Sequence, residues 1–271
     1  MPGIIERTAD STPFDALAST YDVDFTGSPL ARELRGRVQA RLAALFPAGT
    51  SVLELGCGTG EDALWLARRG VRVLATDSSP AMLEQTRQKT AGEPLVTVQR
   101  LDLSALPADD VRQLDGVFSN FGPLNGLPGW RDLAHWLAIR MTPGTPAAFG
   151  VMSRYCLWET AWHGLHGHLG TAFRRWDGHA TFRLSADGAT LAITYPTVRA
   201  FTAAFDPWFR RVRLLPIGVF LPPTDAYGVV ERRPRLSKNL LTLDRRFGRF
   251  GWQANIADHF WIEFVRTEIP A

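Results

Sequence analysis

The chain contains a glycine-rich turn and three acidic side chains in an arrangement that is typical of a ligand-binding site. Glu54 lies just before residues 56–60 (GCGTG), and Asp77 and Asp102 each follow an apolar segment further along. Glycines let a ligand approach the backbone, and a helix N-terminus after them presents N–H groups to it. A carboxylate about 20 residues beyond the first glycine is placed to bind ribose hydroxyls. The pattern therefore predicts a ligand that contains a nucleoside.

Regular elements must hold these residues, and the sequence predicts where they lie. Residues 52–55 predict a buried strand, residues 62–69 a helix, and residues 71–76 a second strand that ends at Asp77. Strands that alternate with helices are typical of a parallel α/β sheet, which binds ligands at the carboxyl ends of its strands. The alternation continues with predicted helices over 80–91 and 130–141 and predicted strands over 95–100, 114–119 and 146–152.

The turn differs from the one that binds dinucleotides. That fingerprint has its third glycine at the position that Glu61 occupies here. Glu54 would also repel a pyrophosphate, whereas a carboxylate at this position suits a ligand whose tail carries a cationic amine. Residues 54–60 (ELGCGTG), followed by Asp77 and Asp102, resemble the class I S-adenosylmethionine-dependent methyltransferase family over about residues 35–152.

The resemblance implies an α/β fold with a Rossmann-like seven-stranded sheet and an antiparallel last strand. It also implies S-adenosyl-L-methionine as cofactor and S-adenosyl-L-homocysteine as product. In the family, the acid at Asp102 accepts a hydrogen bond from the adenine amino group, although Asp102 could instead cap a turn at Ser104. A tyrosine at the end of an N-terminal helix, here residues 14–22, lies near the cofactor's carboxylate, although Tyr21 could equally be a packing aromatic. The expected cofactor-binding residues are Tyr21, Glu54, Gly56, Cys57, Gly58, Gly60, Asp77, Ser78, Asp102, Leu103 and Asn120.

The remaining segments are predicted to complete the core and to insert a cap into it. We expect residues 1–152 to form N-terminal helices and the cofactor-binding core, residues 153–197 to form a helix-hairpin cap after the fifth strand, and residues 198–271 to form the remainder of the core. Because the cap follows a strand's carboxyl end and is rich in Trp, His, Tyr and Phe, it suits a small apolar or aromatic substrate. Predicted helices cover 29–46, 155–169, 197–205 and 229–247, the last of them broken by Pro234. Predicted strands cover 179–185, 190–195, 209–220 and 259–267.

Candidate catalytic residues follow from the chemistry of methyl transfer, an in-line displacement in which the protein chiefly aligns the reactants and excludes water. Asn120, after the fourth strand, is expected to orient an acceptor N–H or O–H, although it could equally be a turn residue. A hydroxyl or carbon acid would also need a base, for which His163, His166 and His168, and then Tyr155, are candidates. A surface or capping role is the alternative for each of them. No metal site is expected, because these histidines lack carboxylate or thiolate partners.

Composition limits the other classes of function. The 271 residues carry a net charge of +3, contain no apolar run long enough to span a membrane, and include two cysteines, Cys57 and Cys156. Two distant cysteines support neither a disulfide framework nor a zinc cluster. We therefore expect a cytoplasmic monomer or homodimer that acts on a small-molecule acceptor, with neither nucleic acid nor a membrane as partner.

Alternative functions remain open at this point. The basic segment 231–238, with Arg245, Arg246 and Arg249, could bind RNA and make the chain an RNA methyltransferase, although such a charge run is usual on a solvated helix face. The chain could also be a non-catalytic S-adenosylmethionine-binding module. Aminopropyl transferases resemble this fold too, but residues 119–121 (SNF) offer none of the acids that their reaction needs. The expected function is methyl transfer to a small, apolar or aromatic molecule, with an O, N, S or C acceptor atom left open.

Overall fold

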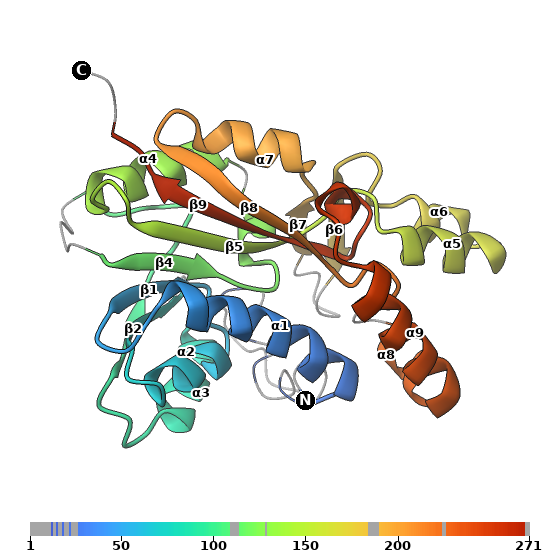
Figure 1. Ribbon diagram of the computed structural model, residues 1–271, viewed down its shortest axis with the longest axis horizontal. Coiled ribbons are helices and arrows are strands. Elements are labelled where there is room, and N and C mark those ends of the chain that lie inside the picture. The colour runs from blue at the N-terminus through green and yellow to red at the C-terminus, as the bar shows by residue number, and fades with distance from the viewer. Residues whose placement is uncertain are drawn as a thin grey trace, which may run out of the picture.

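The computed structural model of the chain contains a seven-stranded sheet, and it describes residues 12, 15, 18, 22, 27–108, 114–127, 129–183, 190–223 and 226–268. The strands are β1 (Ser51–Leu55), β2 (Arg72–Asp77), β3 (Val96–Arg100), β4 (Gly116–Ser119), β5 (Pro146–Met152), β8 (Phe209–Ile217) and β9 (His259–Arg266). Their order is β3-β2-β1-β4-β5-β9-β8 (Figure 1). β1 to β5 pair in parallel, and β9 runs antiparallel to β5 and β8. The predicted Rossmann-like sheet with an antiparallel last strand is confirmed.

Helices cover both faces of this sheet. α1 (Pro29–Leu45), α2 (Glu61–Ala67) and α3 (Pro80–Lys89) lie on one face, and α4 (Trp130–Arg140) and α7 (Val198–Phe205) lie on the other (Figure 1). The side chains of Ser28 and Ser79 accept hydrogen bonds from backbone N–H groups at the starts of α1 and α3, and a proline follows each serine. Apolar helix faces pack on strands that are buried on both sides, so the sheet is the centre of the core.

Aromatic side chains fill the core between α7 and the sheet. Phe201 and Phe205 of α7 contact Phe149 of β5 and Phe264 of β9, and the rings of Phe205 and Phe264 stack with their centroids 4.8 Å apart. All four side chains are fully buried. This packing holds the antiparallel strand β9 beside the parallel strands, and it therefore determines which residue of β9 reaches the edge of the sheet.

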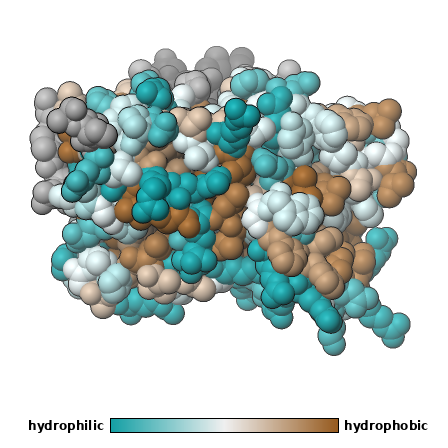
Figure 2. All heavy atoms as spheres, turned by 45° about the horizontal axis from the view of Figure 1, so that its top comes forward, coloured by the Kyte–Doolittle hydropathy of each residue, from teal (hydrophilic) through white to brown (hydrophobic). Residues whose placement is uncertain are grey.

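Between β5 and α7 the chain leaves the sheet and forms two helices and a hairpin. α5 (Leu157–Leu165) packs on α6 (Leu169–Ala172), and β6 (His179–Arg183) pairs with β7 (Thr190–Thr194) in a separate antiparallel sheet. Figure 1 shows these elements beyond one end of the large sheet's strands. The side chains of Leu165 and Leu169 are exposed there, and Figure 2 shows apolar atoms at this end of the molecule, on its right. A helix followed by a hairpin was expected here; that they form a substrate cap stays a prediction.

The basic helix predicted over 229–247 is broken at Pro234, as expected. α8 (Tyr227–Glu231) ends before Pro234, and α9 (Pro234–Phe247) begins at that proline, whose missing N–H is tolerated only in the first turn of a helix. Some of the positive charge of α9 is neutralised within the protein, because Arg245 pairs with Glu33 of α1. In the part of the chain that the structure describes, no helix combines the length and the apolar character needed to cross a membrane. Nor do the described residues contain a cluster of ligands that could hold a metal ion.

Candidate functional site

The carboxyl ends of the parallel strands border a cavity of about 660 Å³, within the range of about 300–1,000 Å³ that is usual for ligand pockets. Gly56 follows β1, Asp77 ends β2, and Met152 ends β5, and all three residues line the cavity. Because β9 is antiparallel, its first residue, His259, lies at the same edge, opposite Met152. The cavity therefore has a glycine-rich end over β1 to β3 and a second end over β4, β5 and β9.

Three glycines shape the turn after β1. Gly56, Gly58 and Gly60 have φ angles of 71°, 53° and 81°, which lie in the left-handed region that favours glycine. A Cβ atom at Gly56 would lie 2.3 Å from the Cβ of Pro123, and one at Gly60 would lie 2.6 Å from the Cγ2 of Thr86. Gly56 and Gly58 line the cavity, whereas Gly60 shapes the turn from outside the lining. Larger residues would therefore close the space or distort the turn.

Two backbone N–H groups hold Asp77 at the glycine-rich end of the cavity. Its Oδ2 accepts a hydrogen bond from the N–H of Gly58 and its Oδ1 from the N–H of Ser79, both at 2.9 Å. Burial raises the pKa of Asp77, and these donors act in the opposite direction. The carboxylate is thus fixed in place beside the turn.

Asp102 lies at the same end of the cavity and also forms the turn that the sequence left open. Its Oδ1 accepts hydrogen bonds from the backbone N–H and the hydroxyl of Ser104. Asp102 lines the cavity, as do Cys57, Ser78 and Leu103. The turn-forming role and the ligand-binding role of Asp102 are compatible.

Glu54 is buried below the glycine turn, and one of its oxygens lacks a partner. The residue is 3% exposed and borders the cavity, and its Oε2 has no hydrogen-bond partner within the described structure. Burial raises the pKa of Glu54 well above its ordinary value, the carboxylate of Asp62 adds to this, and Arg35 opposes it. Because a buried acceptor without a donor is costly, a cationic ligand group is the partner that this position lacks.

Asn120 lies where the two ends of the cavity meet, and Asp62 holds its amide. The Nδ2 of Asn120 donates to Asp62 at 2.8 Å, and Asp62 also accepts a hydrogen bond from Arg35 at 2.7 Å. The Oδ1 of Asn120 is buried with no partner among the described residues. The next residue, Phe121, has a φ of 54°, which is uncommon for a residue other than glycine. The loop after β4 is therefore held in an unusual conformation at the cavity.

Two residues of the N-terminal segment reach the glycine-rich end. Asp15 accepts a hydrogen bond from the hydroxyl of Ser79 at the start of α3, and Asp22 accepts one from the hydroxyl of Thr59 in the glycine turn. Tyr21 lies outside the described residues. Its assignment to the cofactor site therefore stays a prediction.

Comparison with known proteins identifies the family. A family model described as a methyltransferase domain matches residues 52–143. The chain is 32% identical over 154 residues to the demethylmenaquinone methyltransferase of Thermus thermophilus, and the match covers 52% of this chain and 70% of that protein. The chain belongs to the class I S-adenosylmethionine-dependent methyltransferase family.

Other similar proteins carry different names. The demethylmenaquinone methyltransferase of Clavibacter sepedonicus is 34% identical over 134 residues, or 49% of this chain, and the chain spans only 54% of that relative's length. The S-adenosyl-L-methionine-dependent Diels-Alderase iccD of Talaromyces variabilis is 33% identical over 97 residues, which cover 34% of this chain and 33% of that protein. The solved structure of the CcbJ methyltransferase from Streptomyces caelestis has a TM-score of 0.60 at 18% identity, covers 96% of this chain and all of its own, and supports the fold.

S-adenosylmethionine is the cofactor of this methyltransferase family, and the glycine-rich end fits it. The amino group of its methionine tail matches the unpartnered oxygen of Glu54, and its ribose hydroxyls match the carboxylate of Asp77. Asp102 and Leu103 would hold the adenine, and Gly56 leaves the backbone open to the ligand. In methyltransferases of this family the bound cofactor supplies the activated methyl group, and the protein aligns the acceptor and excludes water.

At the other end of the methyltransferase cavity, apolar side chains meet a buried network of charges. The Nη2 of Arg175 lies 3.0 Å from the Oε2 of Glu159 and 2.9 Å from the Oδ1 of Asp258, and the Oδ2 of Asp258 lies 3.0 Å from the Nδ1 of His259. Neither Asp258 nor His259 was expected among the site residues. The predicted antiparallel direction of the last strand could have indicated them, because it places the start of that strand at the ligand-binding edge of the sheet. The apolar lining consists of Phe121, Leu127, Met152, Phe182, Leu191 and Ile193.

Of the predicted catalytic residues, the structure brings only Asn120 to the cavity lining. Tyr155 packs against Trp176, and the Nδ1 of His166 lies 2.7 Å from a carbonyl oxygen of its own helix. His163 has a buried Nε2 with no partner among the described residues. Tyr155, His163 and His166 lie away from the lining because the β6–β7 hairpin and the residues just after α6 form the wall on this side. Their catalytic roles stay predictions.

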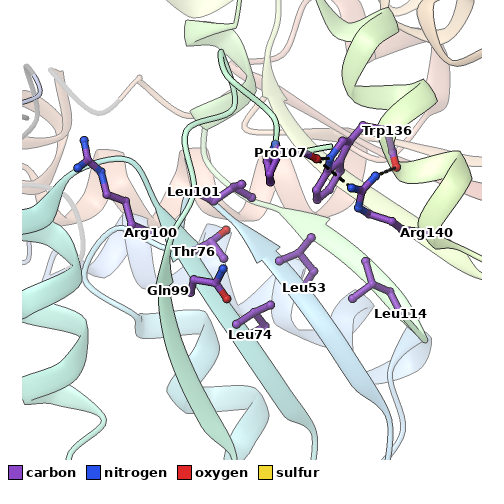
Figure 3. A pocket seen from close by; sticks show the side chains of 10 residues that line it. All are labelled: Leu53, Leu74, Thr76, Gln99, Arg100, Leu101, Pro107, Leu114, Trp136 and Arg140. Atoms are coloured by element: carbon purple, nitrogen blue, oxygen red, sulfur yellow. Dashed lines mark hydrogen bonds between the residues drawn. The ribbon is translucent and has the colours of Figure 1, made fainter. Parts of the chain in front are cut away.

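A second cavity, of about 220 Å³, lies between α4 and the strands β1 to β3 (Figure 3). Its described lining contains no acid and no glycine turn, and it is formed largely by side chains such as Leu53, Leu74 and Trp136. Arg140 and Trp136 donate hydrogen bonds to the carbonyl oxygen of Pro107 there. This cavity therefore lacks the chemical groups of the larger one.

Proposed function

We propose that this protein transfers the methyl group of S-adenosylmethionine to a small apolar or aromatic molecule. The observation that carries the proposal is the shared cavity, which joins the buried Glu54 and the half-buried Asp77 at one end to the apolar side chains of Phe182 and Leu191 at the other. An in-line displacement needs both reactants in one water-poor space at a defined distance, and a continuous cavity meets that need.

Several relatives favour a small-molecule acceptor. Three of them are named as demethylmenaquinone methyltransferases. The basic charge of helix α9 is weak support for RNA binding, because Arg245 pairs with Glu33 within the protein. A small-molecule acceptor therefore accounts best for the site.

A variant of Asp77 tests the cofactor assignment. We expect Asp77→Ala to weaken the binding of S-adenosylhomocysteine by about 100-fold or more, because each hydrogen bond to a charged group contributes about 1.5–3 kcal/mol. Titration calorimetry measures the affinity. The matched control is Asp132→Ala, which removes an exposed carboxylate of α4 away from the cavity. Near-normal affinity of Asp77→Ala would remove the ribose assignment.

A second function is favoured by one of the relatives. The similarity to a protein named as an S-adenosyl-L-methionine-dependent Diels-Alderase agrees with a chain that binds the cofactor for a reaction other than methyl transfer. One measurement distinguishes the two functions: the transfer of a labelled methyl group from S-adenosylmethionine to an acceptor. A protein that binds the cofactor and transfers no label to a broad set of O–H, N–H, S–H and C–H acceptors would favour the second function.

A further inference from the structure

One histidine of the last strand lies at the apolar end of the cavity. His259 is the first residue of β9 and pairs with Met152 of β5 and Ile217 of β8. Its side chain is largely buried and borders the cavity, and its ring meets the ring of Phe121 edge-on, with the centroids 5.7 Å apart. It is the one histidine among the described residues of the lining. A titratable ring therefore faces the space where the acceptor is proposed to bind.

Asp258 fixes the orientation of this ring. Its Oδ2 lies 3.0 Å from the Nδ1 of His259, and its Oδ1 accepts a hydrogen bond from the Nη2 of Arg175 at 2.9 Å. Arg175 also donates to the carboxylate of Glu159, and its guanidinium lies 5.1 Å from the centre of the Tyr195 ring. A chain of buried charged groups thus runs from α5 to the start of β9 and leaves Asp258 little freedom to move.

The ionisation of Asp258 determines which nitrogen of His259 carries the proton. Burial opposes the charge of Asp258, but its interactions with His259 and Arg175 outweigh burial and lower the pKa of Asp258 to about 2. A carboxylate only accepts hydrogen bonds, so the Nδ1 of His259 must be the donor. The lone pair of the neutral ring is then on Nε2, for which the described residues provide no hydrogen-bond partner.

We propose that His259 is the general base for methyl transfer to an aromatic hydroxyl group, and that Asp258 and Arg175 are positioning residues. This inference rests on the methyltransferase function proposed above and adds the class of acceptor. A hydroxyl is a weak nucleophile until it loses its proton, whereas a neutral amine already presents a lone pair, so an oriented base favours a hydroxyl. Phe121 and Phe182 add apolar surfaces against which an aromatic ring can pack.

The step balances in atoms and charge. The Nε2 of His259 takes the proton as the O–H bond of the acceptor breaks. The oxygen's electron pair forms the new O–C bond to the methyl carbon while that carbon's bond to sulfur breaks, and the bonding pair stays on sulfur. A methyl ether, uncharged sulfur and an imidazolium ring result, and the ring then gives its proton to water. The carboxylate of Asp258 stabilises the imidazolium while it exists.

Two phenols of different acidity test this role. Para-methylphenol keeps its proton near neutral pH and needs a base, whereas para-nitrophenol is largely ionised at mildly alkaline pH. With labelled S-adenosylmethionine, we expect His259→Asn to lower kcat/KM for para-methylphenol by about 100-fold or more and that for para-nitrophenol by less than about tenfold. Asp258→Asn should lower kcat for para-methylphenol with little change in its KM. An equal loss with both phenols would mean that His259 has a structural role only, and would overturn the proposal.

A control and a measurement without turnover complete the test. His135→Asn, at an exposed position of α4 outside the cavity lining, should leave both rates unchanged. With S-adenosylhomocysteine bound, the wild type should ionise para-nitrophenol at a pH where the free phenol is protonated, which its absorbance reports, and His259→Asn should not. If the wild type binds S-adenosylhomocysteine but neither ionises nor methylates these phenols, the hydroxyl assignment is overturned and the cofactor assignment stands. Failure to bind S-adenosylhomocysteine would instead remove the proposed function.

Discussion

Glu54 is a carboxyl group whose surroundings make its ionisation costly. It is buried, it lies near the carboxylate of Asp62, and its Oε2 has no partner among the described residues. The ammonium group of a bound ligand would remove much of this cost. Ionisation of Glu54 and binding of the cofactor should therefore favour each other.

We predict that the affinity for S-adenosylhomocysteine falls as the pH is lowered through the raised pKa of Glu54. Below that pKa the free protein holds a proton on Glu54. The ammonium of the ligand favours the carboxylate, so binding must release that proton, and a higher proton concentration opposes the release. Calorimetry in buffers with different ionisation enthalpies measures the number of protons released.

Glu54→Gln is the control for this prediction, because it keeps the shape of the side chain and cannot ionise. Burial also raises the pKa of Asp77, so proton release by the wild type alone would not separate the two acids. The assignment is wrong if Glu54→Gln binds as tightly as the wild type and releases as many protons.

At the level of elements, the β6–β7 hairpin supplies part of the apolar wall of the cavity. Phe182, Leu191 and Ile193 come from its two strands, which do not belong to the large sheet. Asn125, in the 3-10 helix η3 (Pro123–Gly126), donates hydrogen bonds to the carbonyl oxygens of Met152 and Thr194 at 3.0 and 2.7 Å. The hairpin is thereby joined to the edge of the sheet beside the apolar end of the cavity.

We predict that Leu191→Ala raises the KM for an acceptor by about tenfold, because a fully buried leucine side chain contributes about 1.5–3 kcal/mol. The dissociation constant for S-adenosylhomocysteine should not change, since Leu191 lies away from Glu54 and Asp77. Steady-state kinetics and calorimetry measure the two constants. Leu165→Ala, at an exposed position of α5, should alter neither. Parallel changes in both constants would show that the hairpin acts through the fold as a whole.

Across the whole molecule, the aromatic core behind β5 and β9 holds the site together. Phe205 is fully buried and contacts Phe149, Phe201, Phe209 and Phe264. This packing sets the position of β9 and hence of His259 at its start. The stability of this core is therefore also a condition for the geometry of the site.

We predict that Phe205→Ala lowers the free energy of unfolding by about 3–5 kcal/mol, because it removes a buried ring and leaves a cavity. Urea denaturation measures the change. Phe247→Ala removes a half-exposed ring at the end of α9 and should change stability by no more than about 0.5 kcal/mol. Similar losses for the two variants would contradict the central role of the α7 packing.

Many features of the fold were predictable because they depend on neighbouring residues. The helix expected over 29–46 is Pro29–Leu45, and the strand expected over 71–76 is Arg72–Asp77. Apolar periodicity, a serine cap and a following proline act over a few residues, so they are visible in the sequence. The glycine turn was equally visible, because its positive φ angles are a local requirement.

Local sequence patterns did not predict which histidine lines the cavity. His163 and His166 have the same chemistry as His259 and lie in the aromatic segment of the predicted substrate cap, yet of these three only His259 lines the cavity. The packing of segments that are far apart in the sequence decides which side chain reaches a cavity, and nearby residues do not encode it. Asp258 and Arg175 meet although 83 residues separate them.

The amino-acid order alone was therefore sufficient for the methyltransferase family, the glycine turn and most strand ends, because each depends on a short stretch of chain. The partners of His259 and the composition of the cavity's apolar wall emerged only from the folded chain, because they depend on contacts between segments that are far apart in the sequence.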